Sequence, residues 1–217
     1  VIYTSDHGEM AGEHGLWWKL CFYEGSVGVP MLARLPGVIG GGGASDAVSG
    51  LVDVAPTLAE VAGAGSVEGV DAWDVDGSSL WGLWRGEGDG EVKSNGRPAG
   101  DRSVISQLVD ERGRRVRWAT GMIRRGDWKL WRTTLADGRD LEPVLFNLAD
   151  DPGETRDLGC ATEQAGVREG LLSELGEHWE PVSAMRGAAE QVADLRVLEA
   201  WGSRVAGPIE ETLAFPD

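Results

Sequence analysis

The chain has 217 residues, of which 41% are hydrophobic and 26% are charged, so it is long enough to build a substantial hydrophobic core. Its formal net charge of −16 would repel phosphates and anionic headgroups, which argues against nucleic acid or a membrane as a partner. No apolar run approaches the roughly 18 residues of a membrane-spanning helix. Cys21 and Cys160 lie far apart and make no metal-ligand spacing, so neither a disulfide framework nor a catalytic thiol is predicted.

Metal-ligand and anion-binding side chains are concentrated in the stretch 5–19. The β-branched or aromatic run 1–4 predicts a buried strand, and Gly8 permits a change of direction just after it. Asp6 and His7 therefore lie at a strand end, where both side chains can reach one ion once the backbone leaves the pleat. A carboxylate and an imidazole suit several divalent cations. The alternative is that this pair only caps a turn.

Lys19 ends this stretch and follows the apolar side chains of Leu16, Trp17 and Trp18. We expect this apolar bulk to hold the ammonium at the edge of a partly dry pocket, where it could bind an anionic ester. The alternative is a solvated surface lysine.

The next elements continue the same sheet and add a helix. The apolar run 27–35 predicts a second buried strand, closed by Pro36 and Gly37. The segment 48–63 predicts a strand followed by a helix that the Asp53 side chain caps.

A composition rich in Gly, Glu, Asp, Ser and Pro marks an exposed connection after residue 86. We expect three parts: a sheet-bearing part at 1–86, the connection at 87–101, and a small α+β subdomain with a helical tail at 102–217. Short strands separated by Gly-containing turns are predicted at 104–108, 116–124, 128–134 and 144–148. An amphipathic helix at 163–179 is expected to cover this small sheet, and a second helix at about 188–201 to pack through Val192, Leu195, Leu198 and Trp201.

The segment 102–132 is basic within an acidic chain, with nine basic residues against three acidic ones. It predicts either the solvated face of antiparallel strands or a basic rim that faces an anionic substrate. Lys129, in this segment, is the natural control for the role of Lys19.

Several motifs in this order resemble the C-terminal half of the sulfatase family within the alkaline phosphatase-like superfamily, in particular its choline-sulfatase and arylsulfatase-like branch. The residues that carry the resemblance are Ser5 to Met10, Gly12 to Gly15, Trp17, Lys19, Phe22 to Ser26, Val29, Pro30 and Leu35 to Gly37. The elements at 52–58, 76–80 and 151–154 are also similar. The resemblance implies an α/β fold: the C-terminal part of an alkaline phosphatase-like sandwich, with a small antiparallel sheet plus helix subdomain. Residues 1–86 then correspond to the end of the catalytic domain.

The resemblance also implies a chemistry for the site. Asp6 and His7 become ligands of one divalent metal ion, and Lys19 binds the sulfate of a small sulfated substrate. Calcium is the usual ion of the family; many members carry Asp-Asn where this chain has Asp6 and His7, so manganese and magnesium stay open. His14 either approaches the substrate or fixes its loop.

Sulfatases use a formylglycine nucleophile made within a Cys/Ser-x-Pro-x-Arg motif, and the 217 residues contain no such motif. The chain begins with Val1 inside a predicted strand, so we expect the nucleophile in upstream residues and no turnover by residues 1–217 alone. The alternatives are a phosphonate monoester or phosphodiester hydrolase of the same superfamily, or a noncatalytic fragment. Compartment and oligomeric state stay open.

Overall fold

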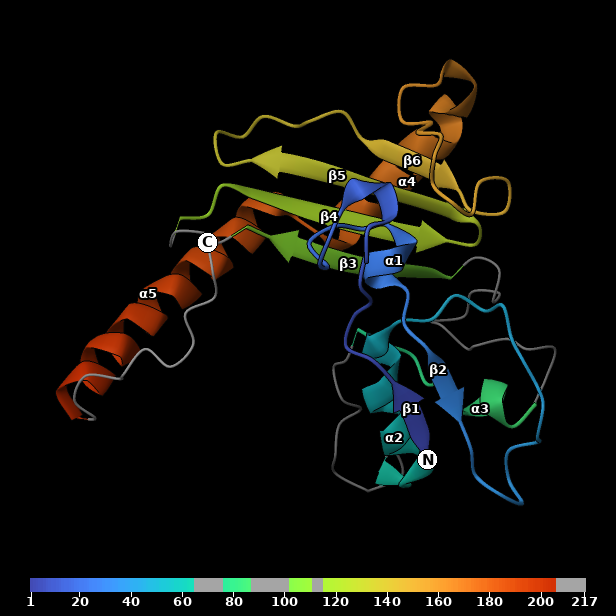
Figure 1. The fold of residues 1–217 in the computed structure, drawn as a ribbon. Helices are drawn as coiled ribbons and strands as arrows, with labels where there is room; N and C mark the ends of the chain where they lie inside the picture. The colour runs from blue at the N-terminus through green and yellow to red at the C-terminus, as the bar shows by residue number, and fades with distance from the viewer. Residues whose placement is uncertain (65–75, 87–101, 111–114, 206–217) are drawn as a thin grey trace.

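The computed structural model describes residues 1–64, 76–86, 102–110 and 115–205 and contains two antiparallel sheets (Figure 1). The smaller sheet lies in the first 86 residues and the larger one after residue 102. The predicted connection 87–101 falls outside the described residues, so the division into three parts stays a prediction. In the described ranges no helix has both the length and the apolar character needed to cross a membrane.

The smaller sheet pairs β1 (Ile2–Thr4) with β2 (Met31–Ala33). The prediction that both segments belong to one sheet is therefore confirmed, but the prediction that both are buried is wrong. Tyr3 and Leu32 lie opposite each other and are 64% and 59% exposed, because alternate side chains of a strand point to opposite faces and only one face is covered. The second strand is also shorter than the predicted run 27–35, whose first residue belongs to α1 (Glu24–Val27).

A buried aspartate organises the segment that follows. Asp53 ends the 3₁₀ turn Leu51–Asp53 and precedes α2 (Val54–Val61), but its side chain makes no capping hydrogen bond to that helix, contrary to our prediction. Its carboxylate instead accepts hydrogen bonds from the backbone N–H groups of Gly50 at 2.7 Å and Ser78 at 2.8 Å, and pairs with Arg102.

Thr57, one turn into α2, completes this connection. Its hydroxyl donates to the carbonyl of Asp53 at 2.6 Å and accepts the N–H of Leu80, just before α3 (Trp81–Trp84), at 2.8 Å. Asp53 and Thr57 are both fully buried. The elements 52–58 and 76–80, similar to sulfatases in sequence, therefore hold each other through buried polar groups.

The larger sheet has the order β3-β4-β5-β6, with each strand antiparallel to the next. Gly126 adopts a φ of 54° in the two-residue turn that joins Arg125 to its partner Trp128, a conformation that glycine adopts without strain. The four predicted strands are confirmed to within two residues at each end. They are β3 (Ser103–Val109), β4 (Trp118–Arg125), β5 (Trp128–Leu135) and β6 (Val144–Asn147).

Two helices, α4 (Ala165–His178) and α5 (Pro181–Val205), cover one face of this sheet (Figure 1). The core between them consists of Ala119, Ile123, Leu130, Leu145, Leu171, Leu175 and Trp179. Gly121 lets Trp179 approach β4, because a Cβ at that position would lie 2.5 Å from the indole ring. Each large side chain in this core contributes about 1.5–3 kcal/mol of burial free energy.

The predicted packing of the second helix is wrong for its C-terminal half. Ala184, Met185 and Ala188 at its start contact the core or are buried, but α5 then continues away from the sheet (Figure 1). Leu195, Leu198 and Trp201 are 55–63% exposed. The apolar spacing correctly predicts a helix. Burial of its apolar side chains would require a neighbouring element that the described chain does not supply.

The opposite face of the larger sheet receives the segment around α1. Tyr23 packs edge-on against Trp131 of β5, with ring centroids 5.4 Å apart, and lies 6.0 Å from the ring of Phe146 of β6. Phe22 also meets Trp131, at 6.3 Å. These aromatic contacts place the chain that connects Lys19 to β2 directly on the sheet.

Candidate functional site

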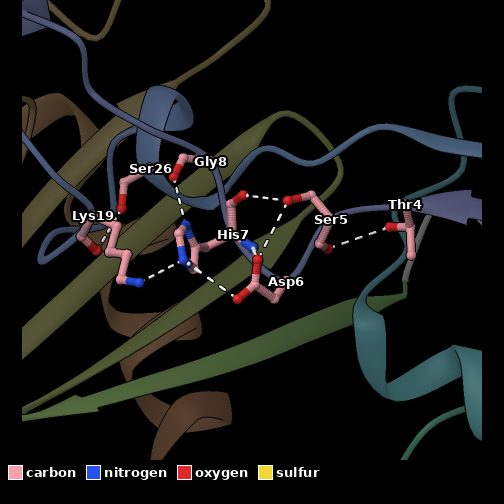
Figure 2. A network of polar contacts seen from close by, with 7 residues as sticks. All are labelled: Thr4, Ser5, Asp6, His7, Gly8, Lys19 and Ser26. Atoms are coloured by element: carbon pink, nitrogen blue, oxygen red, sulfur yellow. Dashed lines mark hydrogen bonds and ion pairs between the residues drawn. The ribbon is translucent and has the colours of Figure 1, made fainter.

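The site is built where β1 ends. Asp6 and His7 follow this strand, and the Ser5 hydroxyl donates a hydrogen bond to the carbonyl of His7 at 2.8 Å, which bends the backbone out of the strand (Figure 2). Gly8 then donates its N–H to the carbonyl of Ser26 at 2.8 Å. A Cβ on Gly8 would lie only 2.1 Å from the carbonyl oxygen of Gly25, so this close approach requires glycine.

The hydrogen bonds of His7 define the state of its imidazole ring. Nδ1 lies 2.7 Å from the carbonyl oxygen of Gly8, and because a carbonyl oxygen only accepts, Nδ1 carries the proton. In the neutral ring this leaves the lone pair on Nε2. Nε2 lies 2.5 Å from Nζ of Lys19 and 3.4 Å from Oδ2 of Asp6 (Figure 2). The structure thus brings together three of the four candidate site residues, Asp6, His7 and Lys19.

Asp6 is ionised at neutral pH. Desolvation by neighbouring atoms works to raise its pKa, but the His7 imidazole, the backbone N–H groups of Asp6 and His7, and the Lys19 ammonium outweigh it and lower the pKa below 3.8. Its side chain is 84% exposed and accepts the N–H of His7 through Oδ1 at 3.1 Å. The second oxygen, Oδ2, is the one that faces the imidazole.

The donor set of Asp6 and His7 fits part of a divalent-cation site. Two ligands about 2.1–2.4 Å from one ion lie about 3.0–3.4 Å apart when they meet it at right angles, which is compatible with the 3.4 Å between Oδ2 and Nε2. The Nδ1–H to carbonyl hydrogen bond is the usual way of orienting a histidine ligand. In the described parts of the chain no third His, Cys, Asp or Glu joins this pair, so these residues alone would leave most of the coordination sphere to other groups.

Lys19 is held by its backbone rather than by an apolar pocket. The hydroxyl of Ser26 donates to its carbonyl oxygen at 2.7 Å. Trp17 and Trp18 are 70% and 69% exposed, so the described chain does not form the predicted partly dry pocket with the ammonium at its edge. Their loop is closed instead by Glu9, whose carboxylate accepts the N–H of Trp18 at 2.6 Å.

His14 occupies a 3₁₀ turn, Glu13–Gly15, with a φ of 51°. Its ring stacks on that of Tyr23, with centroids 4.0 Å apart and planes inclined by 14°. This stacking favours the alternative that His14 fixes its loop. Its approach to a substrate stays a prediction.

A cavity of about 410 Å³ lies between the candidate site that follows β1 and the larger sheet. Asp6, His7 and Lys19 line it from the N-terminal part, and Ser106 of β3 and Arg124 of β4 line it from the sheet. The site therefore faces a space whose other wall comes from residues more than 80 positions away in sequence.

Most of the described basic residues in the segment 102–132 pair with acids, so the segment does not present a row of free cations, and Arg117 remains 56% exposed. The ion pairs are Arg102 with Asp53, Arg117 with Asp110, Arg124 with Glu24, Arg125 with Glu174, Lys129 with Glu24 and Glu154, and Arg132 with Asp140. Lys129 has no exposed side-chain surface, so it is unsuitable as a surface control for Lys19. Arg139, 69% exposed and paired with Asp137, replaces it.

The ion pairs that connect α1 to the larger sheet were not predicted from the sequence. Glu24 belongs to the motif 22–26 and Glu154 to the turn 151–154, and both motifs were noted only as marks of the fold. The signal was present in these two acidic residues, but the 130 positions between them concealed their contact.

Known proteins with similar sequences indicate the family of this chain. Residues 12–95 match the family described as N-sulphoglucosamine sulphohydrolase, C-terminal. Arylsulfatase K of Mus musculus is 36% identical over 163 residues, which cover 75% of this chain and 27% of the relative. Arylsulfatase K of Homo sapiens is 35% identical over 154 residues, or 71% of this chain and 26% of the relative. The chain thus spans about a quarter of the length of the curated relatives it matches.

Solved structures are similar in fold. One is a protein in complex with its substrate D-glucosamine-2-N,6-O-disulfate, with a TM-score of 0.65 and 27% identity over 88% of this chain and 34% of that one. Another is the phosphonate monoester hydrolase of Agrobacterium radiobacter, with a TM-score of 0.57 and 25% identity over 87% of this chain and 35% of that one. The predicted α/β fold class, with small antiparallel sheets plus helices, is confirmed. The chain belongs to the sulfatase family, of which it carries a C-terminal portion.

Proposed function

We propose that the protein hydrolyses a sulfate ester and that this chain supplies two metal ligands and the sulfate-binding lysine. The observation that carries the proposal is the contact of three side chains: the carboxylate of Asp6, the Nε2 atom of His7 and the ammonium of Lys19. A carboxylate oxygen and an imidazole nitrogen bind a cation, while an ammonium binds an anion. Together they suit an anionic ester held between two positive charges.

Each residue has a separate role in this proposal. Asp6 and His7 hold one divalent cation, calcium by family and manganese or magnesium as alternatives; when bound, such an ion polarises the sulfate oxygens as a Lewis acid. The Nε2 lone pair serves one partner at a time, so Lys19 leaves Nε2 when His7 acts as a ligand. Its flexible stem then lets the ammonium neutralise a sulfate oxygen as charge develops in the transition state.

The nucleophile is proposed to lie outside residues 1–217, because their sequence contains no Cys/Ser-x-Pro-x-Arg motif in which a formylglycine could form. For the substrate we propose a small sulfated molecule, supported by the relatives named arylsulfatase K and by the sulfated glucosamine bound to the similar structure.

A second candidate function is supported by one observation. The phosphonate monoester hydrolase of Agrobacterium radiobacter shares the fold at 25% identity, and a cation with a lysine would serve a phosphonate monoester as well as a sulfate ester. The third candidate is a noncatalytic role in metal binding, because the proposed contribution of this chain does not include a nucleophile.

The test compares residues 1–217 alone with a longer gene product that includes the proposed nucleophile. Both are assayed with an activated aryl sulfate and an aryl phosphonate monoester. We expect the longer protein to prefer the sulfate and the short one to be inactive. Preference for the phosphonate would support the second function, and inactivity of the longer protein on both substrates would support the third.

The role of Lys19 is tested in the active protein. We expect Lys19→Ala to lower kcat/KM by roughly 10² or more, because it removes a charge that stabilises the transition state. Arg139→Ala removes a cation from an exposed ion pair and should leave kcat/KM close to the wild-type value. Equal values for wild type and Lys19→Ala would show that the anion site lies elsewhere.

A further inference from the structure

Helix α1 is hydrogen-bonded both to the segment that bears Lys19 and to the segment that bears His7. The Ser26 hydroxyl donates to the carbonyl of Lys19 at 2.7 Å, and the Ser26 carbonyl accepts the N–H of Gly8 at 2.8 Å. Gly8 in turn holds the His7 ring through its own carbonyl. A displacement of α1 would therefore move the ammonium of Lys19 and the imidazole of His7 together.

Helix α1 is itself attached to the larger sheet by charged groups. Glu24, its first residue, binds Lys129 of β5 through Oε1 at 2.8 Å and Arg124 of β4 through Oε2 at 3.3 Å. The backbone N–H of Glu24 donates to Oε2 of Glu154 at 2.6 Å. Glu154 also pairs with Lys129 through Oε1.

This arrangement pairs two carboxylates with two cations, of which Lys129 and Glu154 are buried. The side chains of Lys129 and Glu154 are 0% and 2% exposed, so each depends on the other for the loss of its hydration. Apolar groups of similar volume could fill the space with comparable stability. The charged groups add a defined geometry. Hydrogen bonds and ion pairs are directional and fix the position of α1 on the sheet, whereas apolar contacts would allow it to slide.

The turn that carries Glu154 is shaped for this contact. Glu154 adopts a φ of 51°, a left-handed conformation that costs free energy in a residue with a Cβ. Asp151 holds the turn: its carbonyl accepts the N–H of Glu154 at 3.0 Å, and its carboxylate accepts the Thr155 hydroxyl at 3.0 Å and the N–H of Arg156 at 2.8 Å. The turn thereby places the buried carboxylate of Glu154 within hydrogen-bonding distance of the backbone of α1.

We propose that Glu24, Lys129 and Glu154 are positioning residues of the site, which hold α1 in register on the larger sheet and thereby set the places of Lys19 and His7. They act through α1 and do not touch the substrate. The catalytic consequence rests on the proposed function, whereas the positioning of the segment can be measured without turnover.

The first test measures amide hydrogen exchange in the intact protein. Lys129→Met keeps most of the side-chain volume and removes the charge, while Arg132→Met removes a cation from another ion pair of the same strand. We expect exchange of the peptides that cover 5–28 to accelerate at least about tenfold in Lys129→Met, relative to peptides of the core at 118–135, and to be unchanged in Arg132→Met.

Glu24→Gln keeps the test decisive if Lys129→Met does not fold. It leaves the pair between Lys129 and Glu154 in place and removes only the charge that ties α1 to the sheet. It should accelerate exchange at 5–28 in the same way. Exchange at 5–28 as slow in Glu24→Gln as in Arg132→Met would overturn the proposal.

The second test is kinetic and asks whether Lys129 acts through Lys19. In the active protein, Lys129→Met should lower kcat/KM by about tenfold, and by a clearly smaller factor in a Lys19→Ala background, where only the effect through His7 is left. An equal loss in both backgrounds would assign Lys129 a general effect on stability and overturn the positioning role. If the wild-type protein hydrolyses no sulfate ester, the proposed function fails, and the exchange experiment alone decides the positioning.

Discussion

Nζ of Lys19 lies 2.5 Å from Nε2 of His7, so the lysine proposed to bind an anion contacts the ring atom proposed to bind a cation. The Nδ1–H of His7 is bound to the Gly8 carbonyl, which leaves Nε2 as the only acceptor on the ring. In the structure Lys19 therefore occupies the atom that a metal ion would use. In the proposed function, a cation that binds Nε2 would release Lys19 for the substrate.

The Asp6→Ala, His7→Ala double variant should lose its divalent metal. Both oxygen and nitrogen donors disappear, so the stoichiometry is expected to fall from one ion per protein to none in metal analysis after dialysis. His178→Ala, which removes a histidine at the end of α4, should keep the ion. A folded double variant that retains one ion per protein would show that the ligands lie elsewhere.

Gly8→Ala should disturb the site through the backbone. The added Cβ would lie 2.1 Å from the Gly25 carbonyl oxygen and 2.9 Å from that of Gly28, so either 5–8 or α1 must shift. We expect a loss of about 1–3 kcal/mol in the free energy of unfolding and at least tenfold weaker metal binding, measured by denaturant titration and calorimetry. Gly41→Ala, with no atom within 4 Å of its Cβ, is the matched control. Wild-type metal affinity in Gly8→Ala would contradict the close approach.

Arg102→Met should be strongly destabilising. Asp53 is fully buried and Arg102 is 4% exposed, so the variant leaves a buried carboxylate without its charged partner. The expected loss is about 3–5 kcal/mol in the free energy of unfolding. Arg139→Met, in the exposed pair with Asp137, should cost about 0–1 kcal/mol. Urea titration of both variants distinguishes them, and similar midpoints would argue against a structural role for the buried pair.

The Asp151 turn should lose its contribution to stability in acid. The backbone N–H groups of Arg156 and Thr155, the Thr155 hydroxyl and the Arg156 charge outweigh desolvation and lower the pKa of Asp151 below 3.8. A lowered carboxyl pKa adds stability above the unfolded-state value, and this contribution disappears as pH falls through the folded-state value.

Wild type should therefore be more stable than Asp151→Asn at about pH 6, and the difference should shrink steadily below about pH 4. Urea titrations over this range measure it. Asp150→Asn removes the neighbouring carboxylate and controls for net charge. A gap between wild type and Asp151→Asn that widens in acid would reverse the sign and refute the assignment.

Local patterns in the sequence were sufficient to predict the strands of the larger sheet. Side chains along β3 to β6 point alternately to the two faces of the sheet, and turns such as Gly126-Asp127 separate the strands. The strand bounds therefore follow from the residue types in each short segment. The same holds for the site motif: Asp6, His7 and Lys19 lie within 14 consecutive residues, close enough for one loop to bring them together.

Only the tertiary structure decided which side chains are buried and which charges are paired. Lys129 looks like any strand lysine in sequence, yet its burial depends on Glu24, 105 positions before it, and on Glu154. The apolar stripe of α5 shows the converse, because its spacing predicts a helix but Trp201 is 63% exposed. Backbone conformation responds to neighbouring residues, whereas burial and ion pairing depend on segments that meet only after folding. The sequence by itself therefore determined the strands and the site loop, and the fold determined how that loop is held.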